Sequence, residues 1–183
     1  MFANEDSIYY IGIAIVLLFS AFFSGMEIAF VSSNKLRFEM EREDSGFTSR
    51  IIDIFYKHPS NFISTLLVGN NIALVVYGIF MAHLIEGLIL QTIVSTTIVL
   101  FTGEFLPKAL FRINPNKMLR LFSLPALLFY IILWPISKLT SGLSHALLFL
   151  FGLKVSKEQS NAGFRKADLD HLIQDNIDSI DDE

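Results

Sequence analysis

The sequence predicts an all-α membrane protein: three transmembrane helices plus interfacial juxtamembrane helices, with the N-terminus outside and the C-terminus cytoplasmic. The chain has 183 residues, of which 52% are hydrophobic and only 17% are charged, a composition too apolar for an ordinary soluble domain. Three apolar stretches also reach the roughly 20 residues that a bilayer-spanning helix needs. The basic residues are distributed unevenly around these stretches.

Each span has recognisable boundaries. Pro59 and Ser60 are a start signal for the second span. Only the short connection 83–87 separates the second span from the third, which predicts a tight antiparallel hairpin. The N-terminal tail lacks a basic region and a small-residue cleavage motif, so we expect the first span to be a retained anchor and not a signal peptide. The expected spans are 8–31, 61–85 and 88–110.

Lysine and arginine predict the orientation. Five of them lie between the first two spans, and all the others lie at or after Lys108. The N-terminal tail and the short connection carry acidic residues only. Because positive charge favours the cytoplasmic side, this pattern predicts an outside N-terminus and a cytoplasmic C-terminus.

The stretch 117–152 is apolar but interrupted. Pro125 and Pro135 divide it into uncharged pieces that are short for a span. We therefore expect juxtamembrane helices along the cytoplasmic interface, with Trp134 and Tyr130 near the lipid headgroups. A fourth span or a re-entrant hairpin is the alternative.

Two regions follow from this division. Residues 1–152 form the predicted membrane domain. Residues 153–183 are polar, and their few apolar side chains have helical spacing, so we expect a cytoplasmic linker with a short helix that leads to a further domain. The chain has no cysteine, which excludes disulfides and thiolate metal sites. The sequence shows no phosphate-binding glycine loop and no basic-aromatic pattern typical of nucleic-acid binding.

Polar residues interrupt the first span in the stretch SAFFSGMEIAFV. Ser20, Ser24 and Glu27 stand at i, i+4 and i+7, so they share one helix face. Gly25 beside them allows another backbone to approach. A polar residue inside a span indicates a functional site by default, because burying it in hydrocarbon is costly. The alternative is helix packing by the small residues, with Glu27 extending toward the cytoplasmic interface.

The second span carries two amides. Asn70 and Asn71 follow Gly69 near its middle. Adjacent residues point about 100° apart on a helix, so one can face a site while the other bonds a neighbouring helix. Simple interhelical hydrogen bonding is the alternative.

The third span carries GEFLPKAL. Pro107 has no N–H, and its ring pushes against the carbonyl four residues back, that of Gly103. We therefore expect a helix kink at Pro107 that releases this carbonyl beside Glu104. A freed carbonyl next to a carboxylate is a common way to build a cation site in a membrane. An ordinary proline kink with a Glu104–Lys108 ion pair is the alternative.

These residues together offer only oxygen ligands. The four histidines lie at or outside the span ends. Hydroxyl, amide, carbonyl and carboxylate oxygens suit a hard cation such as Mg²⁺ or Ca²⁺, and they do not suit zinc or copper.

Three motifs, FFSGMEIAF, LLVGNNIAL and GEFLPKAL, occur in an order and spacing that resemble the membrane domain of the CorC/CNNM (cyclin M) family of magnesium transporters. The resemblance runs from about Ile8 to Gly152. It implies a homodimer in the bacterial inner membrane, with a cytoplasmic C-terminus followed by a pair of ATP-binding CBS modules, so ATP would act only through those modules.

The resemblance also implies a Mg²⁺ site. By motif, the metal ligands would be Ser20, Ser24, Asn70, Gly103 through its carbonyl, and Glu104. Glu27 and Asn71 are possible additional ligands. The implied activity is magnesium export or sodium-coupled exchange, with Na⁺ as a possible coupled ion.

A second hypothesis belongs to another class. The domain could be a membrane anchor and dimerisation platform that senses Mg²⁺ or nucleotide through the CBS domains without moving ions. Reconstituted flux would discriminate, because a sensor binds without transporting. An enzyme is not expected, since no set of nucleophile, base and acid is visible in the spans.

Overall fold

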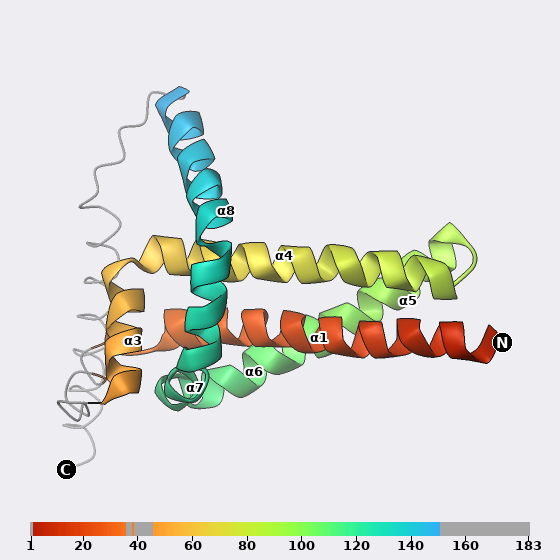
Figure 1. Cartoon of the computed structure of the whole chain (residues 1–183), viewed down its shortest axis with the longest axis horizontal. Coiled ribbons are helices and arrows are strands. Elements are labelled where there is room, and N and C mark those ends of the chain that lie inside the picture. The colour runs from red at the N-terminus through yellow and green to blue at the C-terminus, as the bar shows by residue number, and fades with distance from the viewer. Residues whose placement is uncertain (1, 36–37, 39–45, 151–183) are drawn as a thin grey trace, which may run out of the picture.

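The computed structural model describes residues 2–35, 38 and 46–150, and these residues form helices and contain no strand. From α3 onward the helices follow one another with short connections (Figure 1). They are α1 (Phe2–Ser32), α3 (Phe47–Lys57), α4 (Pro59–Leu84), α5 (Leu88–Ile98), the π-helix η1 (Val99–Phe105), α6 (Leu106–Ile113), α7 (Pro115–Leu121) and α8 (Ser123–Leu150). The predicted all-α class is confirmed for this part of the chain. The predicted cytoplasmic segment 153–183 lies outside it.

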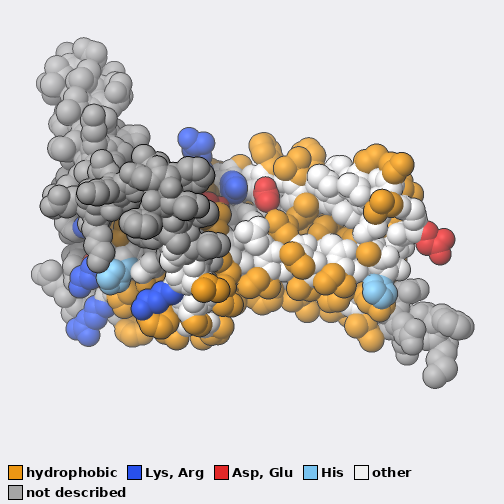
Figure 2. Space-filling model, turned by 90° about the horizontal axis from the view of Figure 1, so that it is seen from above, with side chains coloured by type: hydrophobic (Ala, Val, Ile, Leu, Met, Phe, Trp, Pro, Cys, Tyr) orange, Lys and Arg blue, Asp and Glu red, His pale blue; other side chains and the backbone are white. Residues whose placement is uncertain are grey.

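In the described part of the chain, three helices are long and apolar enough to cross a membrane, and the bent pair Pro115–Leu121 and Ser123–Ile136 would make a fourth if it formed one span. The three helices cover Ser7–Ser32, Pro59–Leu84 and Leu88–Ile113, with 26 residues each. At about 1.5 Å per residue, such a helix exceeds the hydrocarbon core of about 30 Å. Figure 2 shows Lys and Arg side chains gathered toward one end and a largely hydrophobic stretch between the two ends. The three predicted spans are therefore confirmed as membrane-crossing candidates.

The second and third spans form the predicted hairpin. Only residues 85–87 separate α4 from α5. Gly87 adopts φ 93°, a left-handed conformation that is unstrained only for glycine. The chain can therefore reverse within three residues, and the third span returns antiparallel to the second.

An aromatic core lies at the opposite end from the hairpin. The rings of Phe55 and Phe62 stack with centroids 3.9 Å apart, which holds α3 against the start of α4. Tyr130 from α8 packs on both rings and forms a hydrogen bond with the side chain of Asn61. Tyr130 is only 8% exposed, so it packs inside the helix bundle, and its predicted depth near the headgroups stays a prediction. Trp134, by contrast, is 44% exposed and has the Lys138 ammonium 3.8 Å from its ring centroid.

The region after the third span differs from the expected pieces. The chain bends by 67° between α7 and α8, whereas α8 continues through Pro135. Pro125 lies in the first turn of α8, where a missing N–H disturbs no helical bond. The predicted interruptions at the two prolines are therefore replaced by one break at Phe122. Figure 1 shows α8 running across α1 and α4 rather than alongside them.

Candidate cation site between the three spans

The first span turns its serines inward. Ser20 is 1% exposed and Ser24 is fully buried. Both lie in a helix whose other faces are apolar, so their spacing of one turn directs both hydroxyls toward α4 and the third span. The buried hydroxyls need partners, since an unpaired polar group inside a membrane protein is costly.

Ser20 joins the first span to the second. Its Oγ donates a hydrogen bond to Oδ1 of Asn70 over 2.7 Å. This contact bridges positions 50 residues apart in the chain. Two residues predicted for the site are therefore in direct contact, and the Ser20 oxygen still has lone pairs available.

The third span approaches the same serine through Gly103. A Cβ built on this glycine would lie 3.0 Å from the Ser20 Oγ and 3.1 Å from the Val99 Cγ2. Gly103 is also buried. All three spans therefore meet around the Ser20 hydroxyl, and any side chain at position 103 would require its neighbours to shift.

The backbone beside this meeting point has an unusual hydrogen-bond register. The N–H of Leu106 donates to the carbonyl of Phe101, five residues back, as in a π-helix. Pro107 follows and has no N–H. Residue 107 would be the α-helical donor for the Gly103 carbonyl and the π-helical donor for the Thr102 carbonyl. The proline therefore leaves this turn without one backbone hydrogen-bond donor.

A seven-residue π-helical segment precedes Pro107, and the kink predicted at this proline stays a prediction. The span itself continues from Leu88 to Ile113. Segments of π-helix inside α-helices are frequent at functional sites. Glu104 lies in this segment, directly after Gly103, and it is partly buried. No ion pair joins Glu104 to Lys108 in the described part of the chain.

Ser24 differs from Ser20 in having no hydrogen-bond partner among the residues that the structure describes. Its Oγ is buried nevertheless. Buried polar atoms are nearly always paired, so such an exception calls for an explanation. The Ser24 Oγ lies one helical turn from Ser20 and has free lone pairs. It is therefore well placed to coordinate a cation or to accept a hydrogen bond from the water bound to one.

The two additional candidates lie apart from this meeting point. Asn71 is exposed on the outer face of α4, although its neighbour Asn70 points inward. Glu27 is partly buried, and its position seven residues after Ser20 places it about 10 Å farther along α1. The structure therefore groups Ser20, Asn70 and Gly103, with Ser24 and Glu104 adjacent to them along their helices.

One polar contact was missed from the sequence. The hydroxyl of Tyr77 donates to the backbone carbonyl of Ser95 over 3.1 Å, joining α4 to α5. Tyr77 stands seven residues after Asn70 and so shares its helix face. That spacing was readable, but an aromatic residue in an apolar span gives no reason to single out its hydroxyl.

The arrangement offers oxygen atoms from three helices as metal ligands and no sulfur ligand. In the described ranges, no group of three or more His, Asp or Glu side chains could hold a metal ion. Any cation here would therefore be held mainly by hydroxyl, amide and backbone oxygens, with Glu104 as the nearest carboxylate along the chain. Such donors suit a hard cation that keeps part of its water shell.

Comparisons with known proteins show the family of the chain. A family model described as the cyclin M transmembrane N-terminal domain matches residues 11–182. The chain is 32% identical over 143 residues to the UPF0053 protein MG146 of Mycoplasma genitalium, covering 72% of this chain and 34% of that protein. It is 25% identical over 141 residues to the UPF0053 inner membrane protein YfjD of Escherichia coli, covering 74% of this chain and 33% of that protein. The chain thus spans about a third of the length of these relatives.

Proposed function

Since this chain belongs to the cyclin M transmembrane-domain family, we propose that it carries Mg²⁺ across the membrane through the oxygen cluster around Ser20. The cargo would be bound by Ser20, Ser24, Asn70, the Gly103 carbonyl and Glu104. Glu27 would attract the cation on its way to the cluster from the end that bears α3. Asn71 would not be a ligand.

The observation that carries this proposal is the meeting of three spans at one hydroxyl. Ser20 donates a hydrogen bond to Asn70 and lies against Gly103. A movement of any one of the three helices would therefore alter its contacts with the other two. Helix packing alone would account for one interhelical bond. It does not account for the buried, unpartnered Ser24 hydroxyl or for the π-helical segment beside Ser20.

The orientation follows from charge. We propose that the end bearing α3, α7 and α8 is cytoplasmic, because the basic residues gather there. In this orientation α8, which runs across the spans (Figure 1), would lie along the interface with Trp134 and Lys138 at the headgroups. Mg²⁺ would arrive from this end and leave toward the α4–α5 hairpin.

Further partners rest on the family resemblance. We propose a homodimer in the bacterial inner membrane, because the third span has only 6% of its most apolar window buried and Asn71 exposes an amide in mid-span. Both features leave a surface for a second copy. ATP would act through CBS modules outside this chain, and Na⁺ is the candidate coupled ion.

Mg²⁺-dependent thermal stabilisation tests the site. Ligand at about 100 times its dissociation constant stabilises the folded state by about 2.7 kcal/mol. We expect the purified chain to gain this stabilisation and the variants Glu104→Gln and Ser24→Ala to lose most of it.

Matched controls make the test specific. Glu86→Gln makes the same chemical change in the exposed connection, and Ser64→Ala makes it on α4 outside the cluster. Both should keep the Mg²⁺ response. Equal stabilisation of all variants would contradict the assignment. Flux into proteoliposomes, with and without a Na⁺ gradient, then separates transport from sensing, because a sensor binds without moving the ion.

A further inference from the structure

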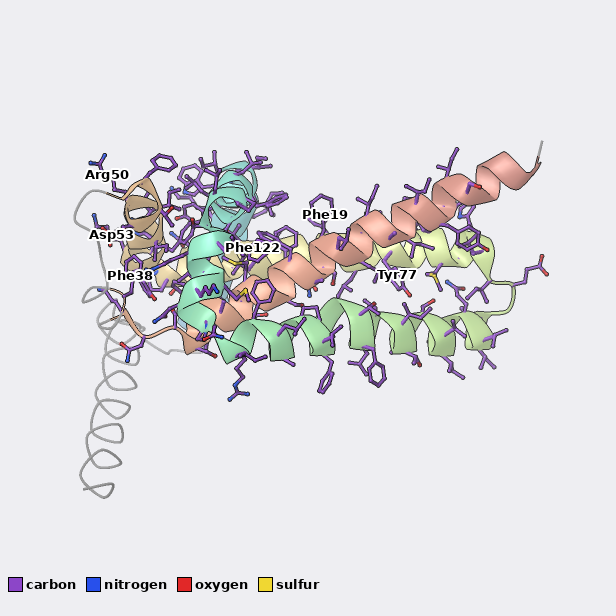
Figure 3. The ribbon with its side chains drawn as sticks, turned by 90° about the horizontal axis from the view of Figure 1, so that it is seen from below. Phe19, Phe38, Arg50, Asp53, Tyr77 and Phe122 are labelled. Carbon is purple, nitrogen blue, oxygen red and sulfur yellow. The ribbon has the colours of Figure 1, made fainter. Side chains whose placement is uncertain are left out.

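The hairpin-side half of the third span is held loosely. No residue of α5 is fully buried. Its main contacts are with α4 and η1, whereas α1 packs against η1 and α6. Figure 3 shows α1 lying close to α6 and diverging from α5 toward the hairpin. Few contacts therefore oppose a movement of α5 away from the bundle.

One buried polar contact does oppose it. Tyr77, only 3% exposed, points from α4 toward the third span (Figure 3) and donates to the Ser95 carbonyl over 3.1 Å. The same carbonyl accepts the N–H of Val99, the residue at which α5 becomes the π-helix. Tyr77 is thus hydrogen-bonded to the third span at the point where the span changes from α-helix to π-helix.

This contact stands between the cation site and the hairpin. Tyr77 lies seven residues beyond Asn70, about 10 Å farther along α4. Beyond it the packing is aromatic: the Phe80 ring would lie 2.7 Å from a Cβ on Gly12, and Tyr9 packs edge-on against Phe80 and stacks on His83. An ion leaving toward the hairpin between α4 and α5 would pass this bond.

We propose that Tyr77 is a gate-positioning residue on the hairpin side of the path. Its bond to Ser95 holds α5 against α4, and loss of the bond lets α5 swing outward on the π-helical segment η1. The cluster around Ser20 then opens toward the hairpin. This inference rests on the proposed transport function.

A cysteine reporter tests the gate. The chain has no cysteine of its own, so Val99→Cys provides a single thiol between the gate and the site. Its reaction rate with a cationic methanethiosulfonate reagent is measured with the purified chain in detergent. Tyr77→Phe removes only the hydroxyl, and Tyr10→Phe makes the same change at an exposed position.

We expect Tyr77→Phe to raise the rate about 3- to 18-fold, the range that corresponds to the strengths measured for interhelical hydrogen bonds in membranes. Tyr10→Phe should leave it unchanged. Equal rates in the parent and Tyr77→Phe would overturn the proposal. A parallel rise at a second reporter, Ala126→Cys in the fully buried core, would mean general loosening of the fold and would also overturn it.

The thiol reaction rates report on the α4–α5 bond whether or not Mg²⁺ binds. Failure of this proposal is therefore distinct from failure of the proposed function.

Discussion

Gly103→Ala is the sharpest test of how closely the three spans meet. The added Cβ would lie 3.0 Å from the Ser20 Oγ and 3.1 Å from the Val99 Cγ2. Neither neighbour can rotate away freely. The Ser20 hydroxyl is held by its 2.7 Å bond to Asn70, and Val99 is β-branched and stiff at χ1. Either the third span shifts by a few tenths of an ångström, or Ser20 releases Asn70.

The energetic cost can be bounded. Overpacking a well-filled interior costs about 1–3 kcal/mol, and alanine recovers about 0.5–1 kcal/mol through its better helix propensity than glycine. We expect a net loss of about 0–2.5 kcal/mol, which corresponds to a melting temperature lower by up to several degrees for a chain of this size. The Mg²⁺-dependent stabilisation should fall as well, because the same movement displaces two proposed ligands.

Thermal unfolding in detergent, with and without Mg²⁺, measures both effects. Gly78→Ala is the control, since a Cβ there meets nothing within 4 Å. It should be neutral or slightly stabilising and should keep the Mg²⁺ response. If Gly103→Ala melts and responds like Gly78→Ala, the third span does not approach Ser20 as the structure has it, and the three-helix site is refuted.

Three further predictions follow from the packing of α4. Gly69→Ala should destabilise by about 1–3 kcal/mol in thermal unfolding, because its Cβ would lie 2.5 Å from the buried Phe23 ring; an unchanged melting temperature would contradict this contact. Asn70→Leu should abolish the Mg²⁺ response, whereas Asn71→Leu, on the exposed face, should retain it; equal loss in both would show that the outward amide is also a ligand. Phe62→Ala should cost about 3–5 kcal/mol, since this ring is fully buried in the aromatic core, and a loss below about 1 kcal/mol would show that the core tolerates the cavity.

The two asparagines show how far the sequence could predict the candidate site. The sequence indicated that adjacent amides point about 100° apart and that one could face a site. It could not say which, because both faces of the second span are apolar and no hydrophobic stripe marks the inside. Contact with Ser20 decides that Asn70 faces inward.

Tyr130 shows a similar limit. An aromatic residue with a hydroxyl in an interfacial helix is typical of the headgroup region, but it is equally suited to a core that offers a hydrogen-bond partner. Tyr130 packs on Phe62 and bonds Asn61, and both partners come from the start of the second span. Such long-range neighbours are not encoded in the local pattern.

The sequence by itself determined the number, length and succession of the three spans and the hairpin between the last two. These features depend on local quantities: the run of apolar residues that a bilayer requires, and a glycine that permits a left-handed turn. Only the tertiary structure decided that Ser20, Asn70 and Gly103 meet, that a π-helix precedes Pro107, and that Tyr77 bonds to the Ser95 carbonyl. The physical reason is that helical periodicity defines the faces of each span, whereas helix rotation and close packing select which faces touch.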